Sequence, residues 1–85
     1  MTGNEITVTI LVDDQPGSYT FENSTKVEEI LKHLLPKEEK ENWTQYELET
    51  EAGKDLDPGG TLPENGVEPG AVLSFNKKEG GGGLR

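Results

Sequence analysis

The chain contains no cysteine and only one histidine in its 85 residues. Without a thiol it can form no disulfide framework, no thiolate nucleophile and no sulfur ligand for a metal ion, as is usual in a reducing cytoplasm. The histidine, His33, is predicted to lie on the face of a helix opposite its apolar residues, with no second histidine or cysteine to join it. We therefore expect no metal site, no bound cofactor and no enzymatic activity, since a nucleophile–base pair is also missing.

Long apolar runs and positive charge are also scarce. Hydrophobic residues make up 29% of the chain, and no run approaches the roughly 20 apolar residues that cross a bilayer. The first five residues have neither the basic nor the apolar segment of a signal peptide, so we expect a cytoplasmic protein. Lysine and arginine number 8 against 17 aspartates and glutamates, for a net charge of −9. Such acidity disfavours nucleic acid and membranes as partners and favours basic proteins.

The apolar residues that are present fall into periodic segments, which indicates one small domain with a thin core, expected to be a monomer. Residues 6–12 alternate apolar and polar with many β-branched side chains, so they predict a strand. Residues 13–17 have the composition of a turn, and residues 18–21 alternate again, which completes a hairpin. The side chains predicted to face the core are Ile6, Val8, Ile10 and Val12 of the first strand and Tyr19 and Phe21 of the second.

A short amphipathic helix is predicted after the hairpin. Thr25 and Glu28 have the spacing of a capping box, in which two side chains bond the backbone amides of the first turn. Pro36 should end the helix after about ten residues, because the residue before a proline avoids the α conformation. Residues 37–42 are charged and lack apolar periodicity, so they predict a solvated connector with room for a short helical turn. The apolar stripe of the helix comprises Val27, Ile30, Leu31 and Leu34.

Three further strands are predicted in the second half of the chain. The first begins near Trp43, which should cover the edge of the core, and runs to about Thr50. A turn at 52–53 separates it from a very short strand at 54–56, and the last strand covers 71–75. The more apolar face of the last strand consists of Ala71, Leu73 and Phe75.

A loop with two apolar anchors connects the last two predicted strands. Residues 58–60 predict a turn, and residues 61–67 predict a compact loop or one 3₁₀ turn held by Leu62 and Val67. The order β-β-α-β-β-β predicts a mixed five-stranded sheet, with its first and last strands parallel in the centre and the helix on one face. This is an α+β fold of the β-grasp type. We assign it to residues 1–76, and residues 77–85 to a flexible glycine-rich tail.

Two segments resemble the ubiquitin family. Residues 52–56 read Ala-Gly-Lys-Asp-Leu, and residues 59–62 read Gly-Gly-Thr-Leu, which match the A-G-K-x-L and G-x-T-L patterns of ubiquitin-like folds. The resemblance covers roughly residues 5–83 and implies the ubiquitin-like β-grasp fold. In that fold the hydroxyl of Thr61 holds a turn. The resemblance also makes Lys54 the candidate acceptor of a further modifier.

The chain ends in four consecutive glycines, Gly80 to Gly83, followed by Leu84 and Arg85. Glycines give a thin segment that suits a narrow cleft in another protein. The resemblance implies a bacterial modifier precursor, from which a processing protease removes Leu84 and Arg85 and leaves Gly83 as the new end. An E1-like activating enzyme would then use ATP to adenylate this end, and an E2-like enzyme would pass it to target proteins. The alternative ends are Gly82 and Gly81.

Two other functions are open to the same fold. A sulfur carrier delivers a terminal thiocarboxylate, but such carriers usually end in Gly-Gly, and the extension at 84–85 counts against this function. A non-covalent interaction domain would work without residues 80–85. The acidic segment 47–51 departs from the apolar patch that ubiquitin's receptors bind, so those receptors should bind this chain poorly. The target protein, the choice of amide or ester bond, and an origin in a tandem array stay open.

Overall fold

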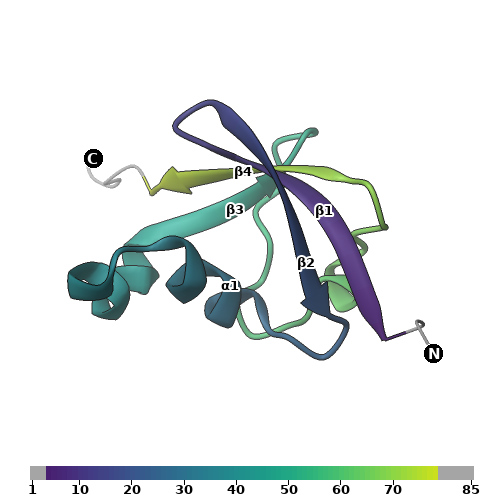
Figure 1. Ribbon diagram of the computed structural model, residues 1–85, viewed down its shortest axis with the longest axis horizontal. Coiled ribbons are helices and arrows are strands. Elements are labelled where there is room, and N and C mark those ends of the chain that lie inside the picture. The colour runs from purple at the N-terminus through teal and green to yellow at the C-terminus, as the bar shows by residue number, and fades with distance from the viewer. Residues whose placement is uncertain (1–3, 79–85) are drawn as a thin grey trace.

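A computed structural model describes residues 4–78 as four strands, one α-helix and two 3₁₀ helices (Figure 1). The strands are β1 (Glu5–Val12), β2 (Gln15–Glu22), β3 (Tyr46–Thr50) and β4 (Val72–Lys77), and the helices are α1 (Val27–Leu34), η1 (Lys37–Gln45) and η2 (Pro63–Asn65). The sheet has the order β2-β1-β4-β3, with β1 and β4 parallel and both outer pairs antiparallel. The predicted parallel pairing of the first and last strands in the centre of a mixed sheet is confirmed.

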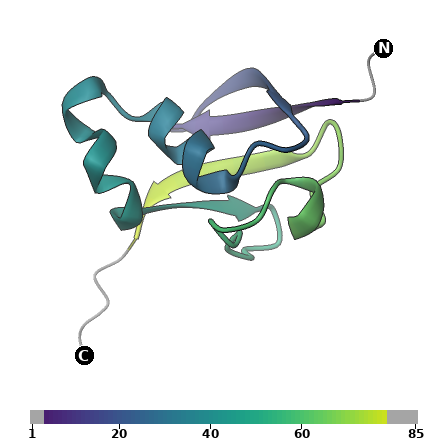
Figure 2. The same cartoon turned by 90° about the horizontal axis from the view of Figure 1, so that it is seen from below.

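The α-helix lies across one face of the sheet, and the core fills the space between them (Figures 1 and 2). The buried apolar residues are Ile6, Val8, Ile10, Val27, Ile30, Leu31, Leu35, Leu48, Leu56, Leu62, Val67 and Leu73. Burial of each aliphatic side chain stabilises the fold by roughly 1.5–3 kcal/mol, so this layer supplies most of the favourable energy. The fold is therefore α+β of the β-grasp type, as predicted. No helix within residues 4–78 is long and apolar enough to cross a membrane.

The turn between β1 and β2 contains two residues, and the prediction of five was wrong. Asp13 and Asp14 adopt left-handed conformations, with φ of 54° and 65°, and Val12 pairs directly with Gln15. A two-residue turn with two positive φ angles matches the twist of the adjoining strands, so the ladder resumes at once. Pro16 is tolerated inside β2 because β2 is an edge strand with one unpaired side.

The N-terminus of α1 is capped by a distant loop, and the predicted capping box of Thr25 and Glu28 is wrong. The N-cap residue forms no side-chain hydrogen bond to the first turn. Instead the amides of Val27 and Glu28 donate to the carbonyls of Gly60 and Pro58, at 2.9 and 3.1 Å. Because backbone acceptors already satisfy these amides, a threonine hydroxyl has no capping role here.

A capping box does occur at η2. The Thr61 hydroxyl accepts a 3.2 Å hydrogen bond from the Glu64 amide, and the Glu64 carboxylate accepts a 2.9 Å bond from the Thr61 amide. The side-chain amide of Asn65 also donates to the Thr61 carbonyl, at 2.8 Å. Leu62 and Val67 are 1% and 7% exposed. The predicted compact turn with two apolar anchors is confirmed.

The predicted strand at 54–56 is reduced to a single bridge between Glu49 and Asp55. The chain diverges from β3 directly afterwards, because the amide of Asp57 donates to the side chain of Asn65, at 2.8 Å, and not to β3. The sheet formed by the described residues therefore has four strands and not the predicted five.

The C-terminus of α1 is closed by η1. Leu35 is extended, with ψ of 149°, so the helix ends before Pro36 as predicted. The connector predicted at 37–42 is the longer 3₁₀ segment η1, from which the Lys40 ammonium donates to the carbonyls of Lys32 and Leu35, at 2.7 and 3.2 Å. One side chain thus bonds two carbonyls at the end of the helix, of which that of Lys32 also accepts a 3.3 Å hydrogen bond from the Leu35 amide.

His33, predicted to lie on the helix face opposite the apolar residues, borders β2. His33 is exposed, but its ring meets the rings of Phe21 and Tyr19 edge-on, with centroids 5.9 and 6.5 Å apart. Tyr19 and Phe21 are themselves half-buried and pack against the core, as predicted. Trp43 also packs against the core while partly exposed, which confirms that it covers the core edge.

Candidate functional site

Residues 79–85 continue from the carboxyl end of β4, which makes this end of the sheet the base of the glycine tail. Tyr46 pairs with Lys77 there, and the Lys78 amide donates a 2.7 Å hydrogen bond to the Gln45 carbonyl. The strand thus runs two residues beyond Phe75, the end predicted from sequence. The predicted processing and conjugation residues lie outside the described residues; they are Gly81, Gly82, Gly83, Leu84 and Arg85.

Two aromatic rings brace the base of the tail. Tyr46 and Phe75 stack with their centroids 5.1 Å apart and their planes at 6°. The Tyr46 hydroxyl donates a 3.3 Å hydrogen bond to the Glu39 carboxylate. Partial loss of solvent around the phenol, together with the nearby negative charge of Glu39, raises the pKa of Tyr46 above its ordinary value of 10.0. A phenol is protonated at neutral pH even at its ordinary pKa, so Tyr46 acts as the donor in this hydrogen bond.

A hollow of about 350 Å³ opens between the β1–β2 turn and the end of β4, and we call it the carboxyl-end notch. It exists because β4 outruns β1: the last parallel pair joins Val12 to Phe75, and two more residues of β4 follow. Half-buried apolar side chains and exposed charged ones share its lining. The lining residues are Leu11, Asp13, Asp14, Tyr46, Ser74, Phe75, Asn76 and Lys77.

Three carboxylates gather beside β3. Glu47 and Glu49 flank the buried Leu48, and Asp55 joins them through its bridge, so that one oxygen of each lies within 4.8 Å of the others. Partial burial raises the pKa of Glu47 above 4.5, and repulsion by Asp55 and Glu49 raises it further, while Lys78 lowers it. Such oxygens suit a hard cation. On an open surface, however, acidic groups also gather without an ion, and we assign no metal site to them.

The sequence analysis missed this cluster, although two signals could have found it. Strand alternation places Glu47 and Glu49 on one face, and a tight turn at Gly53, where φ is 86°, folds the following residues back beside β3. Together these signals predict Asp55 as the neighbour of Glu49.

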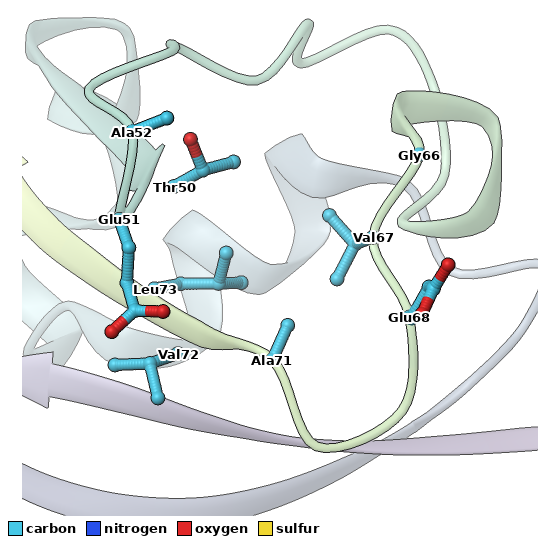
Figure 3. A pocket seen from close by; sticks show the side chains of 9 residues that line it. All are labelled: Thr50, Glu51, Ala52, Gly66, Val67, Glu68, Ala71, Val72 and Leu73. Atoms are coloured by element: carbon cyan, nitrogen blue, oxygen red, sulfur yellow. The ribbon is translucent and has the colours of Figure 1, made fainter.

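A second hollow, of about 300 Å³, lies at the opposite end of β4 (Figure 3). Figure 3 shows Val67, Ala71 and Leu73 pointing into this space, while the carboxylate of Glu68 points away from it. The polar side chains of its lining are Thr50, Glu51 and Glu68. This hollow lies at the end of β4 away from the glycine tail, so we place the candidate site at the other end of the strand.

The candidate acceptor Lys54 lies on the turn that follows β3. Its side chain is exposed, and its backbone amide and carbonyl bond the hydroxyl and amide of Thr50, at 3.2 and 2.9 Å. Because β3 is antiparallel to β4, this turn lies at the end of the sheet opposite Lys78. The ammonium of Lys40 bonds backbone carbonyls, and that of Lys32 lies 5.7 Å from the centre of the Trp43 ring. Neither amine is therefore as accessible to a modifying enzyme as that of Lys54.

Solved structures of similar fold are ubiquitin-like. A protein designed on the basis of ubiquitin matches with a TM-score of 0.69 at 19% identity, over 96% of this chain and 99% of its own. The N-terminal ubiquitin-like domain of the 4931431F19Rik protein matches with a TM-score of 0.71 at 16% identity, over 99% of this chain and 85% of its own. The EccD5 ubiquitin-like domain from Mycobacterium xenopi matches with a TM-score of 0.68 at 17% identity, over 88% of this chain and 96% of its own. At these identities the likeness shows the fold alone, and that fold is ubiquitin-like.

The chain belongs to the sequence family described as Protein of Unknown function (DUF2604), which matches residues 1–83. No curated protein matches it. The family match takes in the four glycines and ends at Gly83, so Leu84 and Arg85 fall outside it.

Proposed function

We propose that this protein is a ubiquitin-like modifier, made as a precursor, cut after Gly83 and joined to target proteins through the carboxylate of that glycine. The observation that carries the proposal is a ubiquitin-like domain whose central strand β4 is followed, after only Lys78 and Glu79, by a run of four glycines. The family match that ends at Gly83 adds support, since Leu84 and Arg85 lie outside the matched residues.

The proposed chemistry accounts for the glycines. A carboxylate is a poor acylating agent, so an enzyme of the E1 class would join it to ATP as an acyl adenylate and release pyrophosphate. An enzyme thiolate would displace AMP to form a thioester, and an amine or hydroxyl of the target would then displace the thiol. Each step needs close approach in a confined cleft, which a residue without Cβ permits. The domain supplies a recognition surface and one carboxylate, and it serves as a substrate and not as an enzyme.

Activation by the E1-class enzyme of the same genome tests the proposal. A chain that ends at Gly83 should support exchange of pyrophosphate into ATP, and the full-length chain should not. The matched control is Gly83→Val in the shortened chain, which places a branched side chain beside the reacting carboxylate and should abolish exchange. Equal exchange by the two lengths, or none by the chain that ends at Gly83, would contradict the proposal.

A non-covalent interaction domain is the second candidate. It is favoured by structural neighbours that are ubiquitin-like domains, one of them the N-terminal domain of its protein. Deletion of residues 80–85 separates the candidates, because it would remove every conjugate of a modifier and leave an interaction domain working. A terminal thiocarboxylate on the processed chain, detected by intact mass, would instead identify a sulfur carrier.

A further inference from the structure

The length of the tail limits how far an activating enzyme can stand from the domain. Five residues separate Lys78 from the proposed carboxylate of Gly83, and five fully extended residues span at most roughly 17 Å. An enzyme that encloses this carboxylate in a cleft must therefore approach the surface around Lys78. That surface includes the end of β4, the turn at Asp13 and Asp14, and the carboxyl-end notch between them.

The notch combines the features of a docking surface. Leu11, on the outer face of the sheet, and Tyr46 and Phe75, on the helix-covered face, are half-buried where the sheet ends, so a partner that closes over this end can bury further apolar area. Asp13 and Asp14 are both exposed, and their carboxylates form no ion pair or hydrogen bond with other residues in 4–78. Two negative charges thus lie beside half-buried apolar residues, in a protein whose net charge is −9.

We propose, on the basis of the modifier function above, that the carboxyl-end notch is the docking surface for the activating enzyme. The enzyme presents basic side chains to the Asp13–Asp14 turn and apolar ones to the half-buried residues at the end of the sheet. Charge complementarity favours a basic partner. The negative electrostatic potential of the protein attracts a basic surface, and the carboxylates of Asp13 and Asp14 position that surface next to the tail. Lys77, on the opposite wall of the notch, disfavours a cation there and so helps to set the orientation.

The variant Asp13→Asn/Asp14→Asn removes both charges and keeps the turn. Both positions have positive φ, and asparagine enters the left-handed region at least as readily as aspartate, so the hairpin should form as before. The matched control is Glu5→Gln/Glu68→Gln. It removes the same charge from two exposed residues that lie near the amino ends of the parallel strands β1 and β4, at the other end of the sheet.

The measurement is the rate of ATP–pyrophosphate exchange against the concentration of the chain that ends at Gly83, with the E1-class enzyme of the same genome. The aspartate variant should raise the KM for the modifier roughly five- to tenfold and leave kcat unchanged, because it weakens docking and not chemistry. Its KM should also depend less on NaCl concentration than that of the unmodified sequence. The control should stay within about twofold of the unmodified sequence.

The outcomes separate the two proposals. An unchanged KM in the aspartate variant, with normal exchange by the unmodified sequence, overturns the docking surface and leaves the modifier function standing. An equal rise in the control also overturns it, because net charge and not the notch would then govern recognition. If the unmodified sequence ending at Gly83 gives no exchange at all, the modifier function is wrong and the docking proposal falls with it.

Discussion

The rings of Tyr46 and Phe75 stack 5.1 Å apart at the end of the sheet from which the glycine tail follows. Together with the hydrogen bond from Lys78 to Gln45, this contact ties the end of β4 to β3 and η1. The base of the tail therefore has a fixed position on the domain. An enzyme that recognises both the domain and the terminal glycine needs such a fixed relation between them.

Removing one ring of the stack should loosen this end of the sheet. Phe75→Ala is expected to lower the free energy of unfolding by about 2 kcal/mol, less than for a fully buried phenylalanine because the ring is half-exposed. Tyr46→Phe keeps the stack and removes only the hydroxyl bond to Glu39, so its cost should be about 0.5 kcal/mol or less. Urea unfolding followed by circular dichroism measures both. Equal losses in the two variants would show that the stack contributes nothing of its own.

Lys40 should stabilise the fold through the helix that it caps. Its ammonium bonds the carbonyls of Lys32 and Leu35, so Lys40→Met is expected to lower the free energy of unfolding by about 1 kcal/mol. The matched control is Lys37→Met, which removes the same charge from an exposed residue of the same element. Thermal unfolding of the two variants compares them directly. If Lys37→Met lowers the Tm as much as Lys40→Met, the carbonyl contacts are not the cause.

The position of the capping box can be tested with two threonines. Thr61→Ala removes the hydroxyl that bonds the Glu64 amide and should destabilise the protein by about 1 kcal/mol. Thr25→Ala should cost less than about 0.5 kcal/mol, because backbone carbonyls already cap α1. The free energy of unfolding in guanidinium chloride, measured for both, decides between them. A larger effect at Thr25 would favour the arrangement that the sequence alone suggested.

Stability should depend on pH through Glu47. Because its pKa is raised in the folded state, the folded protein holds this proton more tightly than the unfolded chain does. Stability therefore falls as pH rises from the ordinary value of 4.5 through the raised one, and the deficit persists at neutral pH. Glu47→Gln removes the ionisation and should stabilise the protein by about 0.5 kcal/mol at neutral pH, after allowance for solvent screening.

The advantage of Glu47→Gln should shrink as the carboxyl becomes protonated in both states, below about pH 4. Glu51→Gln removes one charge outside the cluster and serves as the control. Urea unfolding at a series of pH values gives the difference between variants. A constant advantage across this range, or an equal one in the control, would mean that net charge and not the cluster is responsible.

The sequence predicted those parts of the fold that depend on local pattern. Alternation in β1 placed Ile6, Val8 and Ile10 in the core, and the spacing of Leu62 and Val67 gave the two anchors of η2. It failed where a distant backbone group competes with a local one. The amide of Val27 finds the carbonyl of Gly60, which no pattern near the helix reveals.

The candidate site also has one part that the sequence predicted and one part that it could not. Glycine composition alone pointed to residues 81–83, which lie outside the described residues. The surface beside the tail could not be predicted, because the carboxyl-end notch depends on the register between Val12 and Phe75 and on how tightly the turn at Asp13 closes. Register and turn length follow from tertiary pairing and leave only a weak trace in one sequence.

Processing of the C-terminus tests the central claim most directly. The full-length protein, incubated with the processing protease of the same genome, is measured by intact mass spectrometry. The modifier function predicts a single product that has lost the mass of Leu84 and Arg85 and nothing else, which leaves Gly83 at the end. An unchanged mass, with a protease shown to be active on another substrate, would contradict the claim and favour a domain that works without a free glycine end.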